Sequence, residues 1–283
     1  MKRIASITVF LCLTMVAMGS ALPDSLVALQ SVIEPLLDSQ SVDEAEPYII
    51  DFLEISKEVK DPYYKAFGEF CMGHLENRQN HFKETCLHLM EAKDELQRLR
   101  RNDDVNRLEV RIDLALGACY LSKEMYSQAY ECFMDGVKLN QETVNDPHLQ
   151  FYLDNNLLVL MMDTNGDGDI ISLGERLLSN VQTDQNRYYA YANIGVCHFT
   201  KEAYDVALCY FDTAFTYCHS SIEKATILNY RAQTQYALGQ FDEAVVVCDS
   251  ALRFLGVEDN EIRPRTLILK GVILAELQKN DSA

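Results

Sequence analysis

The residues best suited to chemistry lie between Asp163 and Glu175, in the stretch DTNGDGDIISLGE. Oxygen-bearing side chains alternate there with the spacing of a calcium loop, and the candidate ligands are Asp163, Asn165, Asp167 and Asp169. A calcium loop also needs an oxygen ligand at its ninth residue and a carboxylate at its twelfth, but Ile171 and Gly174 stand there. We therefore expect a turn between two helices, with Ile171 and Leu178 directed inward from the second helix. Weak calcium binding is the alternative.

A second group of possible ligands consists of soft donors for zinc, namely Cys71, His74, His81, Cys86 and His88. The ligands of a zinc site converge tetrahedrally, whereas the helical pattern of this segment spreads the five over several faces. We expect core or surface residues here and no metal.

The sequence also lacks GxSxG, HExxH and Gly-rich phosphate-loop motifs, so no enzyme activity, catalytic residue or cofactor is predicted.

The N-terminus has the order of a secretory signal peptide over residues 1–21. Lys2 and Arg3 precede an apolar run from Ile4 to Ala17, and small residues follow up to Ala21. This run is too short to span a bilayer comfortably, although an uncleaved anchor remains the alternative. We expect an exported protein on the periplasmic or extracytoplasmic side of a bacterial membrane.

The charge of the chain restricts its partners. With 43 acidic against 25 basic residues, the formal net charge is −18, which argues against nucleic acid and anionic membrane surfaces. Nine cysteines occur without any CxxC pair, mostly within apolar helical patterns, as expected of small buried hydrophobic residues. Cys119 with Cys132, and Cys197 with Cys209, could touch and leave one or two disulfides possible.

Three segments repeat one order of small and bulky residues. They read LALGACYLSKEMYSQAYECFMDG from Leu114, ANIGVCHFTKEAYDVALCYFDTAF from Ala192 and NYRAQTQYALGQFDEAVVVCDSAL from Asn229. In the first of them a small residue (Gly117) precedes an aromatic one (Tyr126), and Ala129 follows three positions later. Small residues at such places let two antiparallel helices approach closely.

This order resembles the tetratricopeptide repeat (TPR) family. The resemblance implies an all-α, right-handed superhelical solenoid over residues 22–283, with about six to seven divergent helix–turn–helix units. The expected units lie near residues 25–55, 64–100, 105–138, 148–180, 186–218, 222–254 and 262–283. Because the last unit is incomplete, we expect the natural chain to continue beyond residue 283, with a final capping helix as the alternative.

In this family the first helices of the units line a concave groove. The resemblance places there Phe67, Phe70, His74, Arg111, Leu114, Asn156, Tyr189, Phe199, Asn229, Gln233 and Tyr236. Aromatic, apolar and amide side chains of this kind suit an extended peptide or a partner helix. The set lacks the Lys/Arg/Asn pattern that clamps a C-terminal carboxylate.

The sequence therefore predicts a non-catalytic, protein- or peptide-binding helical repeat. Signal peptide and divergent repeats together resemble the extracytoplasmic sensor regions of bacterial membrane regulators, in which any membrane tether would come from sequence beyond residue 283. A free-standing periplasmic assembly scaffold is the alternative. A calcium-binding adhesion module would depend on Asp163–Glu175 alone.

Overall fold

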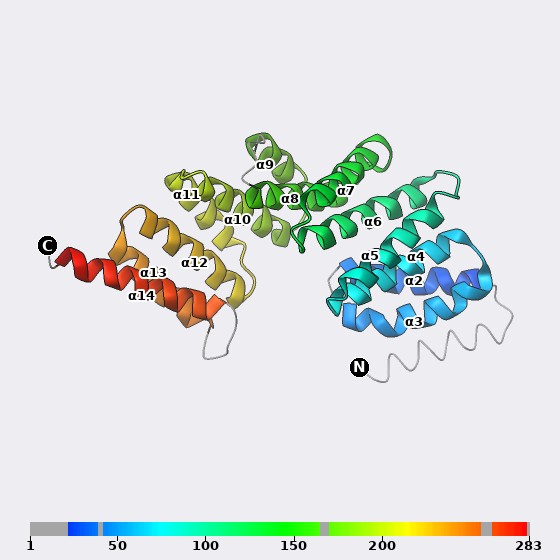
Figure 1. The fold of residues 1–283 in the computed structure, drawn as a ribbon, viewed down its shortest axis with the longest axis horizontal. Helices are drawn as coiled ribbons and strands as arrows, with labels where there is room; N and C mark the ends of the chain where they lie inside the picture. The colour runs from blue at the N-terminus through cyan, green and yellow to red at the C-terminus, as the bar shows by residue number, and fades with distance from the viewer. Residues whose placement is uncertain (1–21, 39–41, 165–169, 256–261, 282–283) are drawn as a thin grey trace. The chain divides into compact units, whose positions relative to one another are not determined.

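The computed structural model describes residues 22–38, 42–164, 170–255 and 262–281. Over these residues the chain forms helices joined by turns, and no strand occurs among them (Figure 1). Successive helices pair as antiparallel hairpins, in which each first helix contacts the helix that follows it. The all-α helical-repeat fold expected from the sequence is confirmed.

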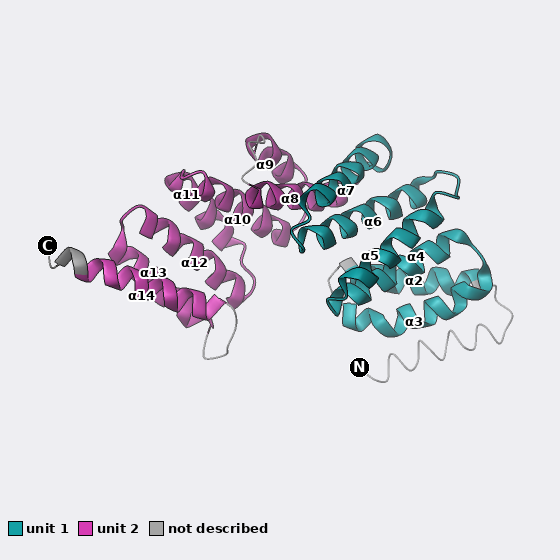
Figure 2. Ribbon diagram, viewed as in Figure 1, with its two compact units in different colours: residues 1–145 teal, residues 146–283 magenta. Residues whose placement is uncertain are grey.

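The chain divides into two compact units, which we call unit 1 (residues 1–145) and unit 2 (residues 146–283; Figure 2). The helices of unit 1 are α2 (Leu22–Asp38), α3 (Val42–Val59), α4 (Pro62–Arg78), α5 (Phe82–Leu96), α6 (Asp103–Leu121) and α7 (Tyr126–Leu139), followed by the π-helix η1 (Asn140–Val144). The helices of unit 2 are α8 (Pro147–Asp163), α9 (Ile170–Ser179), α10 (Asp184–Thr200), α11 (Tyr204–Thr216), α12 (Ser221–Ala237), α13 (Phe241–Leu255) and α14 (Ile262–Asp281).

Local sequence signals set where the first helices begin. Asp61 precedes Pro62 at the start of α4, and its carboxylate accepts a hydrogen bond from the amide of Tyr63. The same Asp–Pro pair starts α8, where Asp146 accepts from the amide of His148. An acidic cap satisfies helical N–H groups that have no partner within the helix, while proline suits the first turn.

One turn geometry recurs within four of the hairpins. Each turn has one residue with a positive φ, in the left-handed region. The backbone N–H of the residue after it donates to the carbonyl five positions earlier. The residues with positive φ are Asn80, Glu124, Glu202 and Gly239. This hydrogen bond closes the end of the first helix and reverses the chain. Because the same turn appears after α4, α6, α10 and α12, it supports the repeat independently of side-chain pattern.

Glycine allows the paired helices to approach where the repeat pattern has its small residue. A Cβ atom at Gly117 would lie 2.4 Å from the ring of Phe133, and one at Gly195 would lie 2.7 Å from Phe211. Both phenylalanines are fully buried on the second helix of their pair. The alternation of small and bulky residues is therefore a packing requirement of the hairpin.

In α9 the expected inward positions are wrong by one residue. Ile171 is 66% exposed and Leu178 is only half-buried, whereas Ile170, Leu173 and Leu177 are buried. In α8, which contacts α9, Leu158 is fully buried and Val159 is half-buried. The physical reason is that α8 has no glycine or alanine to mark the close approach of the pair, so a slip of one residue leaves the apolar pattern almost equally good.

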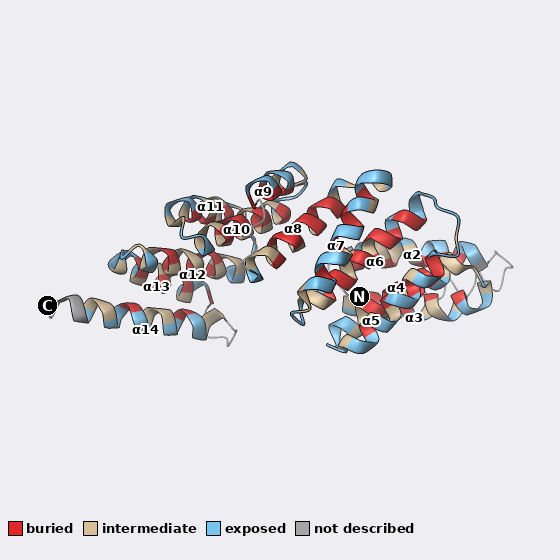
Figure 3. Ribbon diagram, turned by 45° about the horizontal axis from the view of Figure 1, so that its top comes forward, coloured by how far each residue is buried: buried red, intermediate tan, exposed pale blue. Residues whose placement is uncertain are grey.

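Within the helices, buried residues alternate with exposed ones (Figure 3). Helix α14 buries Thr266 and Ile273 but leaves Leu267, Ile268 and Val272 exposed. Among the residues described, no helix has the length and apolar character needed to cross a membrane.

Candidate functional site

The first helices of the pairs in unit 1 are α2, α4 and α6, and we call the side formed by their side chains the first-helix face of unit 1. Side chains of these helices cover this face themselves. Phe67 and Phe70 of α4 are buried, with 0% and 1% exposure, so these expected groove residues belong to the core. The Arg111 guanidinium of α6 lies 5.0 Å above the Phe70 ring. Its Nη1 donates to Glu34 of α2 at 3.1 Å, so that one ion pair joins α6 to α2.

Further polar contacts lie beside this ion pair. Gln30 of α2 donates from Nε2 to Glu34 (3.1 Å) and to the Tyr63 hydroxyl of α4 (3.1 Å).

His74 packs edge-on against Phe70, with ring centroids 4.6 Å apart. Burial from water, together with the positive charge of Arg111, lowers the pKa of His74 to about 4. The imidazole is therefore neutral at physiological pH.

The other groove residue expected on α6, Leu114, is half-buried. Four expected residues of unit 1 thus form one cluster of contacts centred on Phe70, namely Phe67, Phe70, His74 and Arg111. The burial of the rings and the Glu34–Arg111 ion pair leave little of this cluster for a partner.

In unit 2 the first helices form a continuous row, because α8 contacts α10, α10 contacts α12, and α12 contacts α14. We call this row the first-helix face of unit 2. Four expected groove residues are half-buried on α10 and α12, namely Tyr189, Phe199, Gln233 and Tyr236. Half-burial anchors a side chain in the scaffold while part of it stays in contact with solvent.

Amide side chains connect this row. Asn229 of α12 donates to the Thr266 hydroxyl of α14 at 2.8 Å, and Gln233 donates to the Asn229 carbonyl oxygen at 2.5 Å. Between α8 and α10, Asn193 donates to Asn155 at 2.8 Å. Asn229 itself is buried, with 8% exposure, whereas Asn155, Asn193 and Gln233 are half-buried. An amide side chain has two donor hydrogens and an acceptor oxygen, more than these single bonds use.

The predicted residue Asn156 does not take part in these cross-helix bonds. Its side chain donates to the Tyr152 carbonyl of its own helix at 2.8 Å. Its neighbour Asn155 bonds to α10 instead, and neither Asn155 nor Asn193 was expected from the sequence. A register one residue earlier in α8, the same slip that misplaced Ile171, would have identified Asn155.

A buried ion pair fixes α9 against α8. Asp154 is fully buried and accepts two hydrogen bonds from Arg176, one from Nε at 2.8 Å and one from Nη2 at 2.7 Å. Gln150 donates a third at 2.8 Å. These bonds compensate the cost of burying the carboxylate.

The candidate metal ligands have the following places. Asp163 is exposed and ends α8, while Asn165, Asp167 and Asp169 lie outside the described residues. Of the soft donors, His81 contacts Glu76 and His88 contacts Glu69, each at 2.7 Å. In the part of the chain that the structure describes, no group of three or more His, Cys, Asp and Glu side chains could hold a metal ion.

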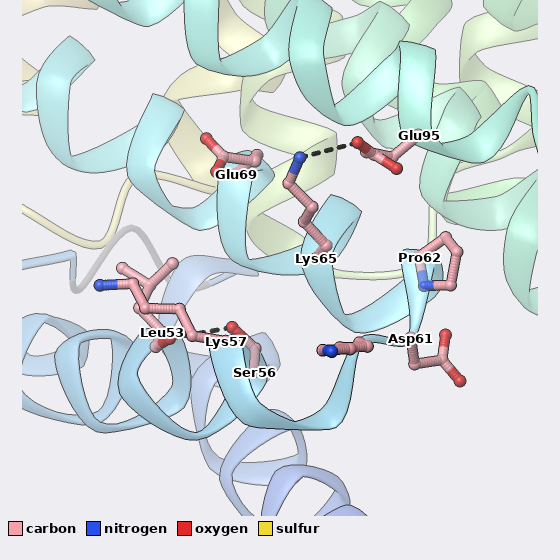
Figure 4. A pocket seen from close by; sticks show the side chains of 9 residues that line it. Leu53, Ser56, Lys57, Asp61, Pro62, Lys65, Glu69 and Glu95 are labelled. Atoms are coloured by element: carbon pink, nitrogen blue, oxygen red, sulfur yellow. Dashed lines mark hydrogen bonds and ion pairs between the residues drawn. The ribbon is translucent and has the colours of Figure 1, made fainter.

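A pocket of about 420 Å³ opens in unit 1 where α3, α4 and α5 meet (Figure 4). Lys65 extends from α4 to Glu95 of α5 at 2.7 Å and also reaches Glu91 at 3.0 Å. Glu69 pairs with His88, and the Ser56 hydroxyl donates to the Leu53 carbonyl. The contacts of Lys65 and Glu69 join α4 to α5, whereas the Ser56 bond stays within α3.

Comparison with known proteins supports the fold. No protein-family model matches the sequence, and no curated protein matches it either. Among solved structures, the apo form of the quorum sensor NprR from B. thuringiensis is similar, with a TM-score of 0.69 and 13% identity over 95% of this chain and 75% of that one. NprR in complex with its cognate peptide NprX has a TM-score of 0.62 at 14% identity, covering 96% of this chain and 77% of that one.

BtubC (BKLC) from P. vanneervenii has a TM-score of 0.63 and 17% identity, covering 78% of this chain and 94% of that chain. At identities this low the likeness concerns the fold. It agrees with the tetratricopeptide-like repeat expected from the sequence.

Proposed function

We propose that this chain is a non-catalytic repeat protein that binds an extended peptide on the first-helix face of unit 2. The observation that carries the proposal is the combination of half-buried rings, Tyr189 and Tyr236, with cross-helix amides, Asn193 and Gln233, on adjoining helices. Amides of this kind can bond to a peptide backbone, and anchored aromatic rings can pack against its side chains.

The contacts on the first-helix faces of the two units differ, and the difference favours unit 2 as the peptide-binding unit. In unit 1 a ligand would have to displace the Glu34–Arg111 ion pair, which lies over the buried Phe70 ring. On the first-helix face of unit 2, the Asn193–Asn155 and Asn229–Thr266 contacts join neutral groups, and Gln185 of α10 donates to the Glu223 carboxylate of α12 without forming an ion pair. Hydrogen bonds of a neutral donor exchange partners at a lower free-energy cost than a half-buried ion pair.

The structural neighbours support a peptide as the ligand class. NprR, which has a similar fold, was determined in complex with its cognate peptide NprX. Because the sequences share only 14% identity, the carry-over to this chain concerns the class of ligand and not its sequence.

For location, we propose an exported protein that acts as an extracytoplasmic sensor or interaction region of a bacterial signalling regulator. The support is the signal-peptide pattern of residues 1–21. A free-standing periplasmic scaffold is the second candidate. A hydrophobic stretch of about 20 residues encoded downstream of residue 283 would favour the sensor, and an immediate stop codon would favour the scaffold.

The binding proposal is tested with a peptide selected from a random library on the intact chain. We expect Tyr236→Ala to weaken its affinity at least about tenfold, because an anchored aromatic residue is a typical binding hot spot. The matched control is Tyr130→Ala, which removes an exposed tyrosine from α7, a second helix of unit 1. Equal affinities of both variants, with unchanged helical circular dichroism, would reject the assignment of this face.

A further inference from the structure

Two cysteine side chains from neighbouring helices touch in unit 1. Cys86 lies on α5 and Cys119 on α6, 33 positions apart, and their Sγ atoms are separated by 3.8 Å. This contact involves a different pair from the Cys119–Cys132 and Cys197–Cys209 pairs that neighbouring helices suggested. All eight cysteines from Cys71 onward are free thiols in the structure.

The two thiols are placed for formation of a disulfide. A disulfide has an S–S distance of about 2.0 Å, so the sulfur atoms must approach by about 1.8 Å for the bond to form. Cys86 is half-buried and accessible from outside, whereas Cys119 is 4% exposed. A small oxidant therefore meets Cys86 first.

We infer that Cys86 and Cys119 are a cross-linking site, which a disulfide-type oxidant such as oxidised glutathione converts to an intramolecular disulfide between α5 and α6. In the first step the Cys86 thiolate attacks the oxidant, forms a mixed disulfide and releases one glutathione thiolate. In the second step the Cys119 thiolate attacks the Cys86 sulfur and releases the other. Two protein thiols are oxidised, one disulfide is reduced to two thiols, and the two protons pass through water to the released thiolates.

The surroundings of the sulfur atoms affect the rate of this reaction. Burial raises the pKa of the Cys86 thiol and raises the pKa of Cys119 to about 12, with the neighbouring sulfur adding to the effect at Cys119. Because the attacking species is the thiolate, cross-linking should proceed slowly at neutral pH and faster as the pH rises.

The cross-link would restrain α6, one of the helices that form the first-helix face of unit 1. Helix α6 carries both Cys119 and Arg111, and Arg111 reaches Glu34 on α2. A bond from α6 to α5 also limits the freedom of the unfolded chain, so the oxidised form should be more resistant to heat.

The decisive experiment needs no substitution. The intact chain is incubated with oxidised glutathione at pH 8, alkylated and digested with trypsin, which cuts after Lys83, Lys93, Arg111 and Lys123. We expect peptide 84–93 to be recovered joined to peptide 112–123. Recovery of both peptides alkylated and separate, or of peptide 112–123 joined to the Cys132 peptide 124–138, would overturn the inference.

Variants then link the bond to stability. Oxidation should raise the Tm of the wild type by at least about 5 °C, as expected for a cross-link that closes a loop of this length. Cys132→Ser, the matched control, should keep this shift, and Cys86→Ser should lose it. An equal shift in Cys86→Ser would contradict the assignment, and if that variant does not fold, the wild-type digest still decides.

Discussion

Asp154 illustrates how one residue can hold a helix pair together where the repeat pattern is weak. Its carboxylate is fully buried and is compensated by Arg176 of α9 and Gln150 of its own helix. Arg176 is partly exposed, so it can be solvated when its partner is removed, whereas a buried carboxylate without Arg176 could not. The pair thus makes the position of α9 depend on a single acidic side chain.

Replacing Arg176 by alanine should therefore destabilise the chain by about 3 kcal/mol, because the buried Asp154 carboxylate is left without its two bonds to the guanidinium. The measurement is the urea dependence of circular dichroism. Asp163→Ala is the control, since Asp163 is exposed at the end of α8, and it should change the stability by less than about 0.5 kcal/mol. Similar losses in both variants would contradict this account.

His74 should make the stability sensitive to acid. Its pKa is lowered to about 4 in the folded chain, below its ordinary value, by burial and by Arg111. The unfolded chain therefore binds a proton more readily, and the free energy of unfolding falls as the pH drops from about 6.5 towards 4.

Between pH 7 and pH 4.5, the wild type should lose about 2 kcal/mol more stability than His74→Phe, which has no proton to bind at this position. Urea unfolding of both proteins at the two pH values measures the difference. Parallel losses in the two proteins would show that protonation of His74 does not couple to folding.

At the scale of helices, the register of α9 gives a sharp test with adjacent residues. Ile170 is buried, with 7% exposure, whereas Ile171 is 66% exposed. Ile170→Ala should destabilise the chain by about 3 kcal/mol, and Ile171→Ala by less than about 0.5 kcal/mol. Thermal unfolding compares the two variants, and a larger effect of Ile171→Ala would restore the register expected from the sequence.

The helix pairs with clear repeat patterns could be predicted from sequence, because each key residue has a single packing role that its size indicates. Gly117 and Gly195 permit close approach, and Phe133 and Phe211 fill the space opposite. The pair α8–α9 could not be predicted to the residue, because its position depends on the Asp154–Arg176 ion pair, a contact across 22 positions that no local pattern encodes.

For the candidate site, the positions of the residues on the first helices could be predicted from the repeat, but the contacts between helices that cover some of them could not. Tyr189 and Tyr236 lie half-buried on first helices of unit 2, at positions that follow directly from the repeat. Phe67 and Phe70 have equivalent positions in unit 1, but Arg111 from α6 and Glu34 from α2 cover that face. Such a covering depends on three helices at once and becomes visible only in the folded chain.

At the scale of the whole molecule, the two units have different properties. Unit 1 has a first-helix face closed by an ion pair and a thiol contact between α5 and α6. Unit 2 has a row of first helices joined by amides. We therefore expect a peptide ligand to protect unit 2 and to leave unit 1 largely unchanged.

The most direct test of this account is to map where a bound peptide lies. A library-selected peptide carrying a photoreactive benzophenone is cross-linked to the intact chain, and the attachment sites are identified by mass spectrometry. The account predicts attachment within residues 147–163, 184–200 and 221–237, the segments of α8, α10 and α12. Attachment confined to the helices of unit 1, or to the second helices α11 and α13, would contradict it.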